Sequence, residues 1–132
     1  MNNTDYQLLI AMIRQFLIPE ENENIKLDIH FRMPSLNIWA LMINIYKKDS
    51  FIYIDEGGIT FKQYYNKPEK YEIIEKTGFK IKRNDQGEEV IFRKINVFEE
   101  FLEANIAQTI IRLINLVEII INEDIPFNFE EA

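Results

Sequence analysis

The segment from Ile38 to Phe61 constrains the fold more than any other, because it is the densest run of strand-forming residues between turn signals. Residues 38–46 are apolar apart from Asn44, so neither alternate set of side chains suits water. We therefore expect a central strand that is covered on both faces. The polar residues 47–50 have the length of a hairpin connection, and residues 51–54 return as a second strand.

A second turn is expected immediately after this hairpin. Residues 55–58 read Asp-Glu-Gly-Gly, and two adjacent glycines allow positive φ without a Cβ clash. Residues 59–61 resume the alternation of apolar and polar side chains. They predict a third strand that follows the turn directly.

Three further segments alternate at strand period. Residues 25–31 place apolar side chains on one side and polar side chains on the other, which predicts a half-exposed strand. Residues 79–82 and 90–93 flank the turn sequence of residues 84–87 and predict a second hairpin. Lysines alternate with apolar residues in its first strand, which is typical of a protected sheet edge.

Three segments carry helix signals. Residues 5–17 follow Thr4, which has the position of an N-cap, and repeat apolar residues at helical spacing. A short helix is predicted over residues 69–76, between Pro68 and the C-terminal cap residue Gly78.

The longest helix is predicted over residues 97–121, after a capping-box asparagine at position 96. Its apolar surface is wider than packing on one sheet face requires. In the remaining tail, apolar residues alternate at Ile125, Phe127 and Phe129, so the tail is expected to add an edge strand or to dock across the core.

These elements define the fold class. We predict an α+β protein whose mainly antiparallel sheet of about five to six strands is flanked by an N-terminal helix, a short middle helix and a long C-terminal helix. The chain has 132 residues, the size of one domain, so residues 1–132 are expected to form a single α+β domain.

Composition excludes several classes of protein. The chain has no cysteine, which excludes disulfides, thiolate metal sites and a cysteine nucleophile. The N-terminal residues lack the features of a signal peptide, and charges interrupt every apolar run before it could span a bilayer. We expect a soluble cytoplasmic protein with no membrane partner.

The formal net charge is −7, which argues against direct binding of nucleic acid unless basic residues cluster in space. In the sequence they hardly cluster. Four late carboxylates, at Glu123, Asp124, Glu130 and Glu131, suggest mimicry of nucleic acid toward a basic protein partner. The alternative is that the acidity only keeps the protein soluble.

Catalytic and metal sites find little support. Asp55 and Glu56 could bind a divalent cation, but carboxylates beside a Gly-Gly turn more often bond the backbone, and the spacing of a calcium loop is absent. His30 is the only histidine, on the polar face of its strand. We expect no enzyme, no cofactor and no metal. Six aromatic residues could supply stacking faces for bases or a protein interface, although most are expected in the core: Trp39, Tyr46, Tyr53, Tyr64, Tyr65 and Tyr71. Tyr64 and Tyr65, where the strand signal fails, are the candidates for exposure.

The strand ending in Ile54, the turn of residues 55–58 and the Met33-Pro34 pair, followed by a short helix, a hairpin and a long helix, resemble the bacterial family catalogued as domain of unknown function 1828. The family's strand-plus-turn reads Thr-Asp-Asp-Gly, and this chain departs from it at Ile54 and Glu56. The resemblance covers most of residues 25–121. It implies no established activity and no catalytic residue.

The surplus apolar surface of the long helix predicts self-association. A symmetric dimer is the commonest way to cover such a surface. We place the contact on the side that carries Phe101, Ile111, Ile114 and Ile121. The alternatives are that the chain covers this side itself or that a different protein does.

The functional hypothesis is a non-enzymatic interaction protein of bacterial or phage type. It could inhibit a nucleic-acid-processing or defence complex through protein contact or nucleic-acid mimicry. The alternative is a small-ligand or metal-binding sensor, or an enzyme, whose site forms only in three dimensions from tyrosines, Asp55, Glu56 and His30.

Overall fold

The structure, a computed structural model, describes residues 3–17, 26–33, 38–58, 60 and 68–131. Its elements in chain order are α1 (Asn3–Leu17), β1 (Lys26–Met33), β2 (Ile38–Lys48), β3 (Phe51–Asp55), α3 (Pro68–Lys76), β4 (Lys80–Arg83), β5 (Glu89–Asn96) and α4 (Leu102–Glu131). The five strands form one sheet in the order β1-β2-β3-β5-β4. Every pairing is antiparallel, which confirms the predicted α+β fold.

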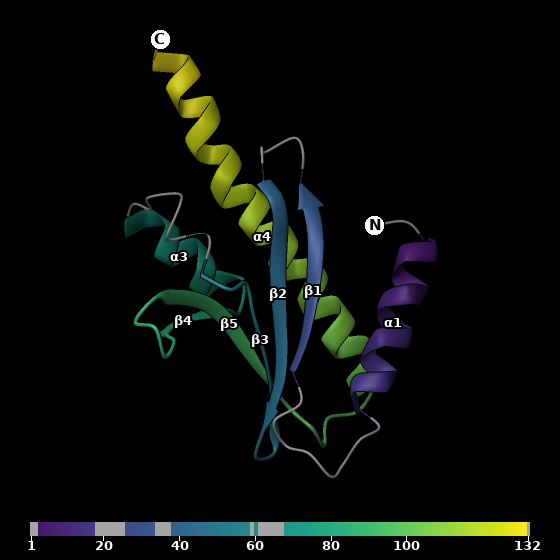
Figure 1. Cartoon of the computed structure of the whole chain (residues 1–132). Coiled ribbons are helices and arrows are strands. Elements are labelled where there is room, and N and C mark those ends of the chain that lie inside the picture. The colour runs from purple at the N-terminus through teal and green to yellow at the C-terminus, as the bar shows by residue number, and fades with distance from the viewer. Residues whose placement is uncertain (1–2, 18–25, 34–37, 59, 61–67, 132) are drawn as a thin grey trace.

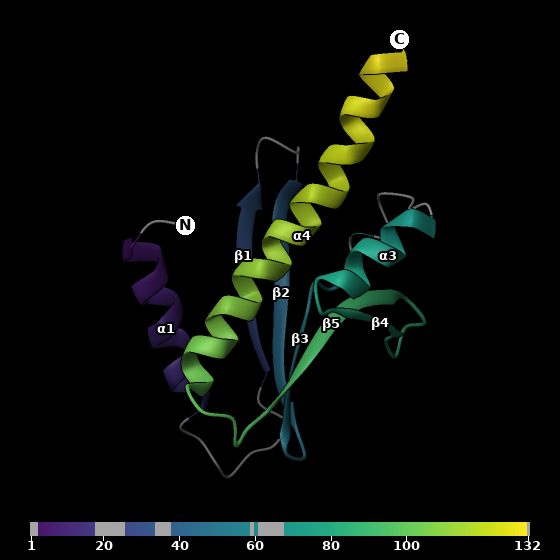
Figure 2. The same ribbon diagram turned by 180° about the vertical axis from the view of Figure 1, so that it is seen from behind.

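The helices gather on one side of this sheet. α4 crosses one face, with α1 beside it (Figure 2), and Arg14 of α1 pairs with Glu103 of α4 at 2.7 Å. Among the described residues, no helix lies over β1, β2 and β3 on the opposite face (Figure 1). We call this second side the open face.

The core lies between the sheet and α4. The β2 side chains that point to it alternate, and they meet the buried stripe of α4. The residues of these two surfaces that are fully shielded from solvent are Leu41, Ile43, Ile45, Ile106, Ala107, Ile110, Leu113, Val117 and Ile120. The sheet of the same chain therefore buries part of the wide apolar surface of α4.

The prediction that β2 is covered on both faces was wrong for the described part of the chain. Met42 and Tyr46, on the open face, stay half-buried, and Asn44 between them bonds Asp55 of β3. Side chains of neighbouring strands shield this side, where the described residues supply no second layer. Asn44, the one clearly polar residue in the apolar run of residues 38–46, lies on the open face, which the described helices do not cover.

The first hairpin is tighter than residues 47–50 suggested. Pairing continues through Lys48 and Phe51, so only Asp49 and Ser50 lie outside the strands. Asp49 has a φ of 56°, a conformation that aspartate tolerates better than most residues.

A third strand was predicted over residues 59–61, directly after the Gly-Gly turn. Thr60 is the one described residue of this segment, and it is helical. The prediction is therefore wrong at that residue. The carboxylate of Glu56 accepts hydrogen bonds from the backbone N–H of Gly58 and of Thr60. These bonds hold Thr60 in its helical conformation. The strand that lies beside β3 is instead β5, which begins only at Glu89.

The short helix and its cap are as predicted. α3 begins at Pro68, and Gly78 follows it with a φ of 88°. The N–H groups of Gly78 and Phe79 donate to the carbonyls of Glu75 and Ile74, so the positive φ closes the helix end.

Both ends of the long helix differ from the prediction. The side chain of Asn96 does cap a turn, accepting from the N–H of Phe98 at 2.9 Å, but Phe101 has a φ of 55° and α4 starts only at Leu102. At the other end the helix continues to Glu131. The predicted edge strand of the tail is therefore wrong.

Candidate functional site

The open face carries polar and aromatic side chains in rows across the strands. In an antiparallel sheet, paired residues point to the same face. One row runs from Tyr46 through Tyr53 to Lys94. The next row crosses all five strands and consists of Asp28, Asn44, Asp55, Phe92 and Lys80.

This face is hollow. The hollow has a volume of about 1220 Å³ and is bounded by β2, β3, β5, β4 and the loop between β4 and β5. Its described lining residues are Met42, Asn44, Tyr46, Lys48, Tyr53, Asp55, Gly57, Gly78, Lys80, Lys82, Arg83, Asn84, Asp85, Gln86, Glu88, Phe92, Arg93 and Lys94.

Three aromatic rings form the floor of the hollow. Tyr46 and Tyr53 stack with ring centroids 5.2 Å apart and planes 7° from parallel. Phe92 continues the stack, 6.3 Å from Tyr53. We call Tyr46, Tyr53 and Phe92 the aromatic row. All three rings are half-buried, so each keeps surface that a partner can cover.

Lys82 lies over the aromatic row. Its Nζ is 5.1 Å from the centroid of Tyr46, 4.7 Å from that of Tyr53 and 4.8 Å from that of Phe92. It also donates a hydrogen bond to the Tyr46 hydroxyl. Burial raises the pKa of Tyr46, and the nearby Asp55 carboxylate adds to the effect. Tyr46 therefore stays a neutral acceptor beside a positive charge that the rings hold in place.

The charge of the hollow is opposite to that of the whole chain. Six of the chain's fifteen Lys and Arg residues are among its described lining residues, but only three of the twenty-two Asp and Glu residues are. Among the described residues, Lys48, Lys80, Lys82 and Lys94 form no ion pair. Within the described part of the chain, the hollow therefore holds four lysines that no carboxylate neutralises by an ion pair.

The wall between β2 and β3 contains a buried polar pair. The Asn44 amide donates to Asp55 Oδ1 at 2.8 Å, and Asp55 also accepts from the N–H of Gly57. This bond orients the amide so that its NH₂ group faces the carboxylate. Asn44 Oδ1 is then buried with no hydrogen-bond partner among the described residues, an arrangement that costs free energy in a native protein.

Glu56, next to this pair, has a structural role. Its side chain is 1% exposed. Oε1 accepts from the N–H groups of Gly58 and Ile91, and Oε2 accepts from the N–H and hydroxyl of Thr60. Burial raises the pKa of Glu56, against the lowering effect of these bonds. Three of these bonds hold the turn after β3, and the fourth, from Ile91, ties that turn to β5. The buried carboxylate is therefore occupied within the chain.

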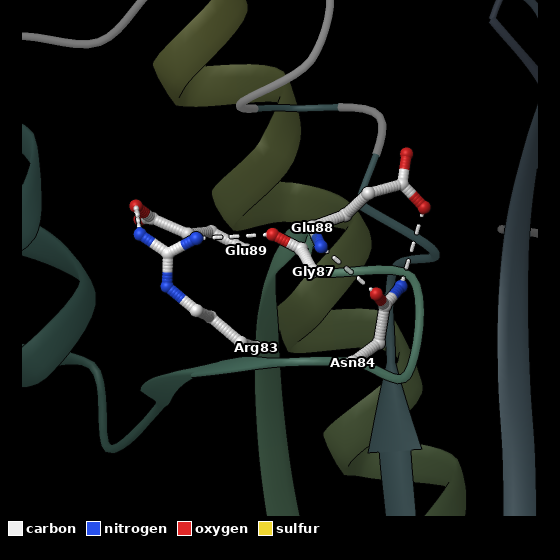
Figure 3. Close-up of polar contacts among 5 residues, drawn as sticks. All are labelled: Arg83, Asn84, Gly87, Glu88 and Glu89. Atoms are coloured by element: carbon white, nitrogen blue, oxygen red, sulfur yellow. Dashed lines mark hydrogen bonds and ion pairs between the residues drawn. The ribbon is translucent and has the colours of Figure 1, made fainter.

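The loop between β4 and β5 forms one rim of the hollow and is held by several side-chain hydrogen bonds. Asn84 Oδ1 accepts from the N–H of Gln86 and Glu88, and its Nδ2 reaches Glu88 Oε1. Arg83 donates to the Gly87 carbonyl and pairs with Glu89 at 3.6 Å, as Figure 3 shows. These bonds position one side of the hollow before any ligand binds.

The sequence-predicted contact residues do not form a single site. Tyr64 and Tyr65 lie outside the described residues. Phe101 is 80% exposed and precedes α4. Ile111 and Ile114 are half-buried on α4, and Ile114 packs against the core.

The late carboxylates Glu123, Asp124, Glu130 and Glu131 lie on α4, where only the backbone is described. Asp55 and Glu56 are occupied by the bonds given above. His30 is exposed on β1 and paired in register with Met42 of the open face. Within the part of the chain that the structure describes, no group of three metal-ligating side chains occurs.

Sequence reasoning found only part of the hollow. Tyr46 and Tyr53 are among the candidate stacking residues and lie on one predicted hairpin. Lys82 and Phe92 were missed, because the β3-β5 pairing that brings them to these rings could not be inferred from local patterns. A signal was present in the alternation of lysines within residues 79–82, although the same pattern is also typical of a protected sheet edge.

No family model, no curated protein and no solved structure matches this chain. The resemblance to the domain of unknown function 1828 thus stays a prediction. None of the described helices is both long and apolar enough to cross a membrane.

Proposed function

We propose that this chain is a non-enzymatic interaction protein that holds its partner on the open face of the sheet. The observation that carries the proposal is the hollow, where an aromatic row and four lysines without described ion pairs lie together. Half-buried rings and unpaired cations on one concave surface are features that binding surfaces share.

The alternative of an enzyme or metal sensor has less support from the geometry. The two carboxylates on which that alternative depends already form structural hydrogen bonds. Asp55 accepts from Asn44 and Gly57, and Glu56 accepts from the backbone of the turn that follows it. A general acid or base needs an accessible side chain near the reacting atoms. The hollow instead offers charge and stacking surface, which suits binding.

The inhibitor hypothesis, with nucleic-acid mimicry by Glu123, Asp124, Glu130 and Glu131, is a separate proposal for the tail of α4. The negative net charge of the chain supports this proposal. The lysines of the open face give it no support. If mimicry operates, charge reversal of these four residues slows association with a basic partner more than it speeds dissociation. An unchanged association rate would exclude it.

The test is affinity capture from a host lysate with three forms of the protein. The natural chain is compared with a double variant of the hollow, Lys82→Glu with Lys94→Glu, and with Lys76→Glu. Lys76 is a matched control because it is exposed on α3 and outside the hollow. We expect a partner that is recovered with the natural chain and the control but not with the hollow variant. Equal recovery with all three forms would contradict the proposal.

A further inference from the structure

We infer that the ligand of the open face is single-stranded nucleic acid, bound with its phosphates on the lysines and its bases against the aromatic row. This inference rests on the proposed function and names the class of ligand. The sequence argued against direct binding of nucleic acid because of the net charge of −7, unless basic residues cluster in space. In the structure they cluster in space.

The first argument is charge complementarity. Lys48, Lys80, Lys82 and Lys94 stand around the hollow on three different strands and form no ion pair among the described residues. A polyphosphate chain neutralises several such cations at once and releases its own counterions, which favours binding. A chain of net charge −7 repels nucleic acid elsewhere on its surface, so binding is confined to this face.

The second argument is the aromatic row. It spans β2, β3 and β5, and adjacent strands are about 4.8 Å apart, so the row extends about 10 Å. That length accommodates two or three bases, as in other sheet surfaces that stack single strands. The ammonium of Lys82 lies about 5 Å from all three rings, so a stacking base must displace it from the rings, and the displaced ammonium can then meet a phosphate beside that base.

The third argument is the Asn44 amide. Its Oδ1 is buried in the wall of the hollow without a partner among the described residues. A hydrogen-bond donor on a ligand, such as the N3–H of a thymine or uracil base, would satisfy this oxygen after a small shift of the neighbouring side chains. A phosphate or a carboxylate carries only acceptors and could not.

The open shape of the hollow favours a strand over a small molecule. Sites for small molecules enclose most of the ligand's surface, whereas this hollow opens to solvent. A duplex is disfavoured because its bases are stacked inside and cannot reach the rings. An acidic, aromatic-rich peptide shares part of this chemistry and is distinguished in the experiment.

The experiment measures fluorescence anisotropy of labelled oligothymidylate and oligouridylate of about ten nucleotides, with a duplex and a peptide of alternating glutamate and tyrosine as comparisons. We expect both single strands to bind. The oligonucleotide that binds with the higher affinity shows whether the ligand is DNA or RNA. The affinity should fall with salt with a logarithmic slope of about −0.7 for each phosphate neutralised.

Substitutions separate the two kinds of contact. Lys82→Gln and Lys94→Gln should each weaken binding and reduce the salt slope by about 0.7. Tyr53→Leu and Phe92→Leu should weaken binding roughly tenfold without changing the slope, because they remove stacking surface and no charge. Lys76→Gln should change neither quantity. Circular dichroism and urea midpoints verify that each variant is folded.

Three results would overturn the inference: no binding of either single strand at about 100 μM protein and low salt, tighter binding of the duplex or the peptide, or equal weakening by Lys76→Gln. The failure of the inference differs from failure of the proposed function. If the oligonucleotides do not bind but the hollow variant still loses its captured partner, the open face is an interaction surface for another class of ligand.

Discussion

Glu56 shows how one buried carboxylate can fix the course of the chain. It receives four hydrogen bonds from Gly58, Thr60 and Ile91. In the protonated form, Oε2 can donate to the Thr60 hydroxyl, 3.0 Å away, and still accept from the Thr60 N–H. Both protonation states therefore fit the site, and burial raises the pKa of this group.

Substitution of Glu56 by glutamine should destabilise the protein. The amide NH₂ cannot accept a hydrogen bond, so at least one buried N–H loses its acceptor, at a cost of about 1–3 kcal/mol in the free energy of unfolding near pH 4. Urea unfolding of the natural chain and of Glu56→Gln measures this difference. The exposed Glu72 on α3 provides the control, since Glu72→Gln should cost less than about 0.5 kcal/mol. Equal costs for the two variants would contradict the structural role of Glu56.

The natural chain and Glu56→Gln also test the direction of the pKa shift. A carboxyl whose folded pKa is raised binds its proton more tightly in the folded state, so its contribution to stability is present below the unfolded pKa of about 4.3 and falls as pH rises through the folded pKa. The difference in unfolding free energy between the two proteins should narrow as pH increases across this window. A difference that widens would show that the four donors lower the pKa instead.

At the scale of elements, Gly78 joins α3 to β4 in a conformation that other residues rarely adopt, with a φ of 88°. A Cβ at this position would meet no atom within 4 Å, so the penalty for Gly78→Ala is purely one of backbone conformation. We predict a loss of about 1 kcal/mol in the free energy of unfolding, measured with urea. Lys76→Ala, in the last turn of α3, is the control and should be close to neutral. A neutral Gly78→Ala would contradict the cap.

Elements whose signals are local were predictable. The capped helix α3, the β4-β5 hairpin and the alternation of β1 depend on neighbours in the sequence, and each is found close to its predicted bounds. The predictions were wrong where a specific contact or backbone conformation determines the secondary structure. Thr60 is helical because Glu56 bonds it, and Phe101 delays α4 through its positive φ. Neither effect is visible in apolar periodicity.

For the whole molecule, the predicted dimer remains a prediction, with its surface revised. Ile114 packs against the chain's own core and is a poor probe, whereas Phe98 and Phe101 are 82% and 80% exposed. We expect sedimentation equilibrium at micromolar concentration to show a dimer that Phe101→Glu weakens. A 15.8 kDa species for the natural chain would contradict it.

The candidate site could be predicted only in part. The β2 residues of the open face alternate visibly in the sequence, and Asn44 stands out among them. Their partners Lys82 and Phe92 arrive through the strand order β3-β5-β4, which brings Lys82 to Tyr46 across a separation of 36 positions. Basic residues that look dispersed in the chain thus become a local cluster, and only topology reveals it.

The most direct test of the account is the mapping of ligand contacts by amide chemical shifts. A titration of the ¹⁵N-labelled protein with a single-stranded oligonucleotide should shift the amide signals of Tyr46, Tyr53, Lys82 and Phe92 in a saturable way. The signals of α1 and of the solvent side of α4 should stay in place. Shifts that centre on the Phe98 and Phe101 region, or that are spread evenly over the surface, would contradict the assignment of the open face as the binding surface.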